Sequence, residues 1–199
     1  MRGKWITTAN RPNKTGLYSF RKILNIPSKA DMTISVCADT SYQLYINDKF
    51  VVMGPCRGAG TYYYETKNVS EYIRHGENCI RIEVLHIADD FYTTALAKDR
   101  PALWFYGEIK NGDKISEVYA DKDWEIWEDN SVRFYIPKVL NSMPPFEERY
   151  YEKKYINRQA EVLYECELDR MCCNSVGTIE KYPLKARSIP EMKLYPRTE

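Results

Sequence analysis

Short runs in which apolar and polar side chains alternate dominate the chain. Alternation with a period of two places apolar side chains on one face of a β-strand, and turn residues bound each run. In the clearest run, Cys79–His86, isoleucine, valine and histidine occupy the even positions, while Arg81, Glu83 and Leu85 face the other way. Further strands are expected at Thr33–Ala38, Tyr42–Ile46, Phe50–Met53, Thr61–Thr66, Ile115–Tyr119 and Leu103–Ile109, the last almost continuously apolar, as in a strand covered on both sides.

Turn residues separate these runs and helical periodicity is scarce. Asn47 and Asp48 tolerate positive φ angles and predict a two-residue hairpin turn. The one helical candidate is a single turn at Val69–Arg74, which Asn68 can cap and Gly76 can end. Many short strands, with turn signals roughly every 8–12 residues, predict an all-β fold of the sandwich or barrel type.

The alternation weakens after about Pro137. A loop rich in proline follows, Asn157–Leu168 can form a strand, and three prolines after residue 180 indicate an extended segment. We therefore expect one domain, with a β-sandwich core at residues 1–140. Residues 141–199 are expected to add one or more strands that complete the sandwich and an extended linker toward downstream domains.

Composition narrows the class of protein. The 199 residues carry a net charge of +1 and are 44% hydrophobic, which argues against disorder and against a nucleic-acid or membrane-surface protein. Aromatic residues stand out, with 17 Tyr, 6 Phe and 4 Trp. The N-terminus lacks the apolar run of a signal peptide. Together with cysteines that appear in no disulfide framework, this predicts a soluble, cytoplasmic protein.

The six cysteines are expected to be reduced and mostly buried. Cys166, Cys172 and Cys173 are the one cluster that could hold zinc, but it needs a fourth ligand and vicinal cysteines rarely chelate one metal. No metal site is therefore predicted.

Local motifs of catalysis are absent: there is no nucleophile elbow, phosphate loop, dinucleotide fingerprint or metalloprotease motif. Of the two histidines, His86 lies on the apolar face of its strand and is expected to be structural, and His75 lies in a polar turn. Paired carboxylates could act on a glycosidic bond, but 28 acidic residues produce such pairs by chance. The pairs are Asp89-Asp90, Glu147-Glu148 and Asp121 with Asp123.

Sugar binding is better supported than catalysis, because aromatic rings stack on the C–H faces of sugars while polar groups bind the hydroxyls. Two groups beside loops have this mixture. Packing alone can also explain both groups. The tyrosines of the first can belong to a strand and fill its core and surface, and the aromatic residues of the second can pack within a turn. Trp104, Trp124 and Trp127 are expected in the core or at a sheet edge. The candidate binding residues are Arg57, Tyr62 and Tyr63 (with Tyr64 beside them) in the first group, and Asp89, Asp90, Phe91 and Tyr92 in the second.

Several short motifs occur in an order that resembles the N-terminal β-sandwich domain of bacterial α-L-rhamnosidases, a jelly roll of the galactose-binding type. Asp121, Trp124 and Arg187–Met192 resemble the closing strands and exit of that domain, so the likeness covers nearly the whole chain. Gly54 is expected to allow an unusual backbone conformation before Pro55 ends a strand. The motifs are Lys4-Trp5-Ile6, Phe20-Arg21-Lys22, Ala38-Asp39, Tyr42–Asn47, Gly54-Pro55, Val69–Ile73 and Gly76–Ile80.

The resemblance implies a non-catalytic role. In that family the catalytic carboxylates lie in a large (α/α)-barrel far downstream, and none of the matching positions here is catalytic. Asn47-Asp48 departs from the family's Asn-Gly, which leaves the turn less relaxed. Jelly rolls of this type often bind Ca²⁺, for which Asp39 and Asp89 are the nearest candidates, although no cofactor is predicted.

These observations lead to one hypothesis and two alternatives. The chain is expected to be a non-catalytic accessory module of an α-L-rhamnosidase-like glycoside hydrolase. Its expected partners are downstream domains of the same polypeptide and a rhamnose- or galactose-containing glycan, with no nucleic acid and no membrane. The first alternative is an independent carbohydrate-binding protein, and the second is a small hydrolase that uses the paired carboxylates.

Overall fold

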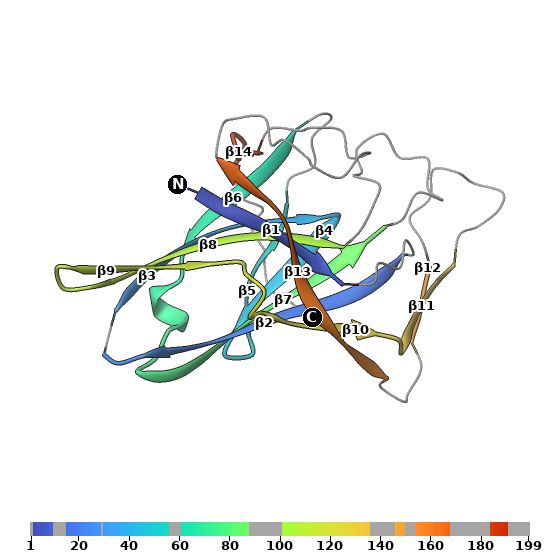
Figure 1. Cartoon of the computed structure of the whole chain (residues 1–199), viewed down its shortest axis with the longest axis horizontal. Helices are drawn as coiled ribbons and strands as arrows, with labels where there is room; N and C mark the ends of the chain where they lie inside the picture. The colour runs from blue at the N-terminus through green and yellow to red at the C-terminus, as the bar shows by residue number, and fades with distance from the viewer. Residues whose placement is uncertain are drawn as a thin grey trace, which may run out of the picture.

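The computed structural model describes residues 2–9, 15–28, 30–55, 61–87, 101–135, 146–149, 154–167 and 184–190. Within these ranges almost every element is a strand, and one 3-10 turn is present (Figure 1). No helix among them has the length and hydropathy needed to cross a lipid bilayer. The elements are β1 (Arg2–Thr8), β2 (Gly16–Ile26), β3 (Asp31–Asp39), β4 (Ser41–Ile46), β5 (Lys49–Gly54), β6 (Tyr62–Asn68), η1 (Ser70–Tyr72), β7 (Gly76–His86), β8 (Ala102–Asn111), β9 (Lys114–Tyr119), β10 (Glu125–Asp129), β11 (Val132–Tyr135), β12 (Phe146–Arg149), β13 (Tyr155–Glu167) and β14 (Leu184–Ala186).

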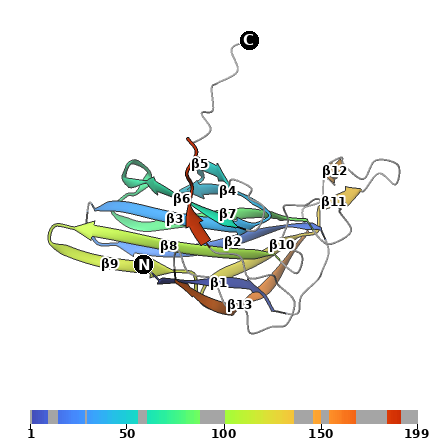
Figure 2. The same ribbon diagram turned by 90° about the horizontal axis from the view of Figure 1, so that it is seen from above.

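Two sheets pack face to face and share one strand. The first sheet has the order β14-β6-β3-β8-β1, with β9 paired to β8, and the second has the order β10-β2-β7-β4-β5. Strand β13 joins them, and β11 and β12 form a separate pair. Both views place the β8–β9 hairpin and the β11–β12 pair at opposite ends of the molecule (Figures 1 and 2). The predicted all-β sandwich is confirmed, with one parallel pairing, β14 on β6, among antiparallel ones.

Strand β13 belongs to both sheets because its two ends have different neighbours. Its first five residues pair with β10, and residues 160–167 pair with β1. In Figure 1 it runs as a long orange diagonal from β1 toward β10. Arg158 of β13 donates from Nε (3.0 Å) and Nη2 (2.6 Å) to Oε2 of Glu128 on β10. The Glu128 side chain is only 1% exposed. A charge-assisted bond to a buried carboxylate fixes this crossing strand in place.

The core between the sheets follows the alternation of the strands. In β2, β4 and β7 the even-numbered residues are mostly buried and the odd-numbered ones mostly half-buried or exposed, so one face of each strand points inward. Phe105 and Trp124 pack with their ring centroids 5.1 Å apart. Core residues from the two sheets include Ile6, Met32, Ile34, Leu103 and Phe105 on one side and Tyr18, Phe20, Leu44, Ile80 and Ile82 on the other.

The expected strands are all present, and most extend slightly beyond the expected bounds. The hairpin turn is confirmed, with φ angles of 52° at Asn47 and 63° at Asp48. The expected helical turn is the 3-10 turn η1, where Asn68 Oδ1 accepts a bond of 3.0 Å from the Ser70 amide. Gly76 follows with a φ of 87°, which explains glycine there. His86 is fully buried, as its position in the strand predicts.

An aromatic layer covers the outer side of the first sheet. Trp5 and Trp104 are almost fully buried there, although they point away from the main core. Tyr62 packs on Trp5 (5.1 Å between ring centroids) and Tyr64 on Trp104 (5.6 Å). Leu184 of β14, which has no exposed surface, completes this cluster. Around this cluster the first sheet is therefore apolar on both faces, as expected for the nearly continuous apolar run of β8.

The extended segment 184–190 lies along the edge of the first sheet. Strand β14 pairs with β6, and the Arg187 amide donates to the Tyr64 carbonyl at 3.0 Å (Figure 2). The Arg187 guanidinium pairs with the buried carboxylate of Glu65 and also donates to the carbonyls of Ile189 (3.1 Å) and Pro190 (2.8 Å). An almost buried ion pair therefore holds this segment against β6.

Truncation after residue 140 tests the contribution of the C-terminal strands, of which β13 is the longest. Because β13 lies between β1 and β10, its removal leaves two unpaired edges and exposes the core beneath them. We expect the 1–140 fragment to lose cooperative thermal unfolding and near-UV circular dichroism. A 1–190 fragment is the matched control and should unfold as the full chain does. A 1–140 fragment with a native-like transition would show that the sandwich forms without β13.

The Glu65–Arg187 pair gives a second prediction. Arg187→Met removes one partner and leaves a buried carboxylate, which should lower the free energy of unfolding by roughly 3 kcal/mol. The double variant Glu65→Gln/Arg187→Met should lose less than the single variant, because no buried charge remains. Urea denaturation measures both. Equal losses in the single and double variants would contradict a buried ion pair.

A candidate binding pocket on the outer face of the second sheet

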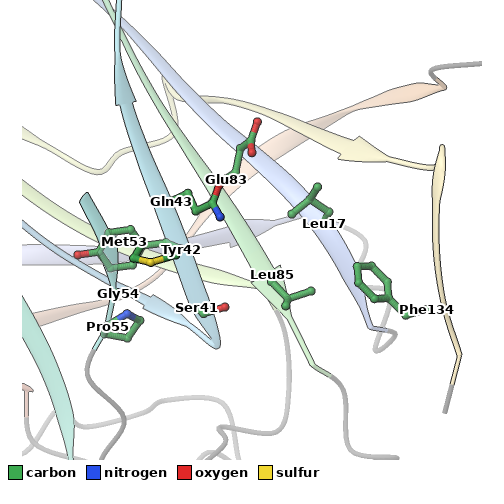
Figure 3. Close-up of a pocket in the computed structure, with 10 residues that line it drawn as sticks. All are labelled: Leu17, Ser41, Tyr42, Gln43, Met53, Gly54, Pro55, Glu83, Leu85 and Phe134. Atoms are coloured by element: carbon green, nitrogen blue, oxygen red, sulfur yellow. The ribbon is translucent and has the colours of Figure 1, made fainter. Parts of the chain in front are cut away.

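A pocket of about 290 Å³ lies on the outer face of the second sheet, at one end of its strands (Figure 3). Ligand pockets in proteins typically measure about 300–1,000 Å³, so this one suits a small molecule or one unit of a longer one. Its lining residues come from five strands and the residue that follows β5. They are Leu17, Ser41, Tyr42, Gln43, Met53, Gly54, Pro55, Glu83, Leu85 and Phe134.

Strand alternation and register bring these side chains together. The core takes the even-numbered residues of β2, β4 and β7, so the odd-numbered ones face outward. Register then places Gln43 opposite Glu83, and Leu85 opposite both Leu17 and Ser41. Two rows of outward side chains therefore form the pocket, one polar and one mainly apolar.

The polar side of the pocket consists of Gln43 and Glu83, which lie next to each other in Figure 3. Two residues of the next outward row bind these side chains and fix their orientation. The Tyr45 hydroxyl donates to Gln43 Oε1 at 2.7 Å, and Arg81 Nη1 pairs with Glu83. Because the Gln43 oxygen accepts from Tyr45, the side-chain N–H groups of Gln43 are the ones that can donate to a ligand. The Glu83 carboxylate can accept from it.

The apolar side consists of Leu17, Leu85 and Phe134, whereas Met53 of β5 lies opposite Gln43. In Figure 3 Leu17, Leu85 and the Phe134 ring of β11 lie together on the side of the pocket away from Met53. An aromatic and aliphatic wall that faces an amide and a carboxylate suits a ligand with an apolar surface and hydroxyl groups at its edge.

A buried carboxylate supports the floor of the pocket. The Tyr42 hydroxyl donates to Glu65, the same carboxylate that pairs with Arg187. Burial, reinforced by the charge of Glu65, raises the pKa of Tyr42 well above its usual value. A Cβ at position 54 would overlap the Glu65 carboxylate, so this close approach requires glycine.

The structure adds a steric reason for Gly54 to the expected backbone one. Positive φ angles occur at Gly76 and Gly112 among the described glycines and not at Gly54, although the Gly54–Pro55 peptide bond is cis. Glycine is needed there for space rather than for a left-handed conformation. A second pocket, of about 240 Å³, lies on the other side of Glu65, where segment 184–190 meets β6.

The residues expected from the sequence are only partly placed. Arg57, Asp89, Asp90, Phe91 and Tyr92 lie outside the described residues, so their role stays a prediction. Two pocket residues lie close in sequence to these candidates. Pro55 is two residues before Arg57, and Leu85 is four residues before Asp89.

The two described candidates, Tyr62 and Tyr63, do not line the pocket. Tyr62 packs against Trp5, and Tyr63 is half-buried on the next position of β6. Sequence reasoning missed Gln43, Phe134 and the rest of the lining, although it placed Glu83 and Leu85 on the outward face of their strand. The missing information was register, which decides which outward side chains are neighbours.

Other expectations concern tryptophans, cysteines and metals. Trp104 and Trp124 are buried as expected, and Trp127 is half-buried in β10. Cys37 is a buried free thiol whose pKa burial raises, and Cys79 is a half-buried free thiol. No group of three or more His, Cys, Asp or Glu side chains could hold a metal ion in the described ranges. Asp89, one of the two residues nearest to a possible calcium site, lies outside these ranges, and the expectation that no cofactor binds stays a prediction.

The fold is similar to part of several solved α-L-rhamnosidases. The enzyme from Dictyoglumus thermophilum matches with 23% identity and a TM-score of 0.54 over 62% of this chain, and that from Aspergillus terreus with 18% and 0.57 over 65%. The GH78 family rhamnosidase of Bacillus sp. GL1 matches with 21% and 0.55 over 66%. The chain covers 16%, 17% and 14% of these proteins, respectively.

At these identities the likeness establishes the fold. No family model and no curated protein matches the sequence. The resemblance to a β-sandwich domain of α-L-rhamnosidases, inferred from short motifs, is therefore confirmed at the level of structure. The part of this chain that aligns covers about one sixth of the length of these enzymes.

Two buried tyrosines test the support beneath the pocket. Tyr42→Phe removes the donor to Glu65 and should lower the free energy of unfolding by about 1–3 kcal/mol, because the buried carboxylate loses a bond. Tyr18→Phe is the matched control. The Tyr18 hydroxyl is buried without a hydrogen-bond partner among the described residues, so its loss should be neutral or slightly stabilising. Urea denaturation that gave both variants the same loss would contradict this difference.

Proposed function

We propose that the chain is a non-catalytic accessory module of an α-L-rhamnosidase-like glycoside hydrolase, which packs against downstream domains of the same polypeptide and contacts a glycan. The observation that carries the proposal is the shared fold with three α-L-rhamnosidases, of which the chain covers about one sixth. Accessory domains supply binding and positioning, whereas the catalytic groups belong to another part of the enzyme.

The pocket supports the glycan-contacting role. Phe134, Leu17 and Leu85 offer an apolar wall for the C–H face of a sugar ring, and Gln43 and Glu83 offer a donor and an acceptor for its hydroxyls. A volume of about 290 Å³ accommodates a small ligand such as one sugar unit. Rhamnose and galactose, both neutral hydroxylated rings, are the proposed ligands.

The arrangement of acids supports a non-catalytic role. Glycoside hydrolysis ordinarily uses two carboxyl groups on either side of the bond that breaks. Among the described lining residues Glu83 is the one carboxylate, and it is paired with Arg81. Asp121 accepts bonds from the Asp123 amide (3.0 Å) and from Lys22 Nζ (3.2 Å), which is a structural role in a turn.

A second candidate is an independent carbohydrate-binding protein. The pocket favours it because this chain alone forms the described lining. The reading frame downstream separates the two candidates: a continuous frame into a large helical catalytic domain supports the accessory module. A frame without one supports the independent binder.

Titration of the isotopically labelled chain with L-rhamnose and D-galactose tests the glycan contact. We expect millimolar sugar to shift the amide resonances of residues 41–43, 53–54 and 83–85. Gln43→Ala and Phe134→Ala should each weaken binding by about 1 kcal/mol or more, a typical loss for a contact in a binding site. Ile115→Ala, at a 57% exposed position of β9, is the control and should bind as the unmodified chain does.

The same protein should not hydrolyse an aryl α-L-rhamnoside. Measurable turnover that survives purification of the chain would overturn the non-catalytic role. The absence of any resonance shift at millimolar concentrations of either sugar would overturn glycan contact and leave a purely structural module.

A further inference from the structure

A third row of outward side chains continues the second sheet beyond the pocket. It comprises Arg81 on β7, Tyr45 on β4 and Phe50 on β5, which are direct neighbours across the strands. Phe50 is 36% exposed, and the Arg81 side chain is 27% exposed. The row therefore presents an aromatic ring and a cation to solvent beside the pocket.

Direct contacts join this row to the polar side of the pocket. Tyr45 donates to Gln43, and Arg81 pairs with Glu83. The Arg81 guanidinium also lies over the Tyr45 ring, 4.2 Å from its centroid. Phe50 meets that ring edge to face, with 5.8 Å between centroids and an interplanar angle of 76°. The row and the pocket wall form one connected and mutually oriented surface.

The charges of this surface cancel within it. Arg81 pairs with Glu83 and lies 3.7 Å from Asp48, and Arg21 of the same row lies 3.7 Å from Glu125. A surface that neutralises its own cations has little preference for a phosphate or an acidic peptide, because such a ligand would have to displace the existing partners. It is complementary to an uncharged ligand rich in hydrogen-bonding groups.

We propose that the binding surface is a strip that runs from the pocket over Arg81 and Tyr45 to Phe50, and that it binds a neutral oligosaccharide of at least two sugar rings. This inference rests on the proposed glycan contact and names its ligand class. Rows on one face of a strand repeat every two residues, about 6.6 Å, so three rows extend over roughly 13 Å. That length exceeds a single sugar ring and accommodates neighbouring ones.

The residues of the strip have distinct roles. One ring of the ligand occupies the pocket against Phe134, and a ring further along the oligosaccharide stacks on the exposed Phe50 ring. Arg81 and Glu83, between these two positions, donate to and accept from hydroxyl groups of both units. Tyr45 is a positioning residue, because it orients the Gln43 amide and supports Arg81 and Phe50.

Calorimetric titration with ligands of increasing length tests the strip. The probes are L-rhamnose with an α-linked rhamnose disaccharide and trisaccharide, and D-galactose with the corresponding galactose oligomers. We expect the disaccharide or trisaccharide of one series to bind about three- to tenfold more tightly than its monosaccharide, the gain of one stacking contact. Phe50→Ala should abolish this gain and leave monosaccharide affinity unchanged, whereas Phe50→Tyr should retain it. Thermal melting establishes that each variant folds.

The outcomes separate the strip from the pocket. Equal affinity for monosaccharide and oligosaccharide, or a length-dependent gain that persists in Phe50→Ala, overturns the strip and leaves the pocket as a site for one ring. No binding by any member of either series overturns the glycan contact and the strip together. A gain that Phe50→Ala removes and Phe50→Tyr restores supports the strip.

Discussion

The buried carboxylate of Glu65 is the interaction on which the most distant parts of the structure depend. A carboxylate inside a protein is costly unless charges and hydrogen bonds compensate it. Here Tyr42 of the second sheet and Arg187 of the C-terminal segment supply both, and Gly54 leaves space for the group. Because Glu65 itself belongs to the first sheet, one side chain ties both sheets, the β14 segment and the pocket floor together.

The strands of the second sheet form the core with one set of residues and the proposed binding surface with the alternate set. The even positions of β4 and β7 fill the core, and the odd positions form the outward rows that include Gln43, Glu83 and Tyr45. A rigid core therefore orients the outward side chains at little additional entropic cost. Side chains on regular strands are better ordered than those on loops, which suits the proposed binding surface.

Strand alternation made much of the fold predictable, and its failures have physical causes. The run Cys79–His86 was clear because its outward positions are mostly polar, whereas β2 carries Leu17 and Ile23 on the outward side, which obscures its period. The outward direction of Glu83 could be predicted from one strand. Its proximity to Gln43 and Phe134 could not, because it depends on register and on the placement of β11. The sequence alone instead favours the aromatic residues beside loops as sugar-binding candidates, because their residue types suit sugars whatever their neighbours are.

The position of β13 also has a consequence for synthesis on the ribosome. This strand comes late in the chain, at residues 155–167, yet it lies between β1 and β10 and closes the contact between the sheets. Until it emerges, the nascent chain presents two strand edges that can pair with other chains. Folding must also wait for contacts of long sequence separation, which are slow to form. The domain therefore depends on nearly all of its length having been translated, and on protection of those edges in the interval.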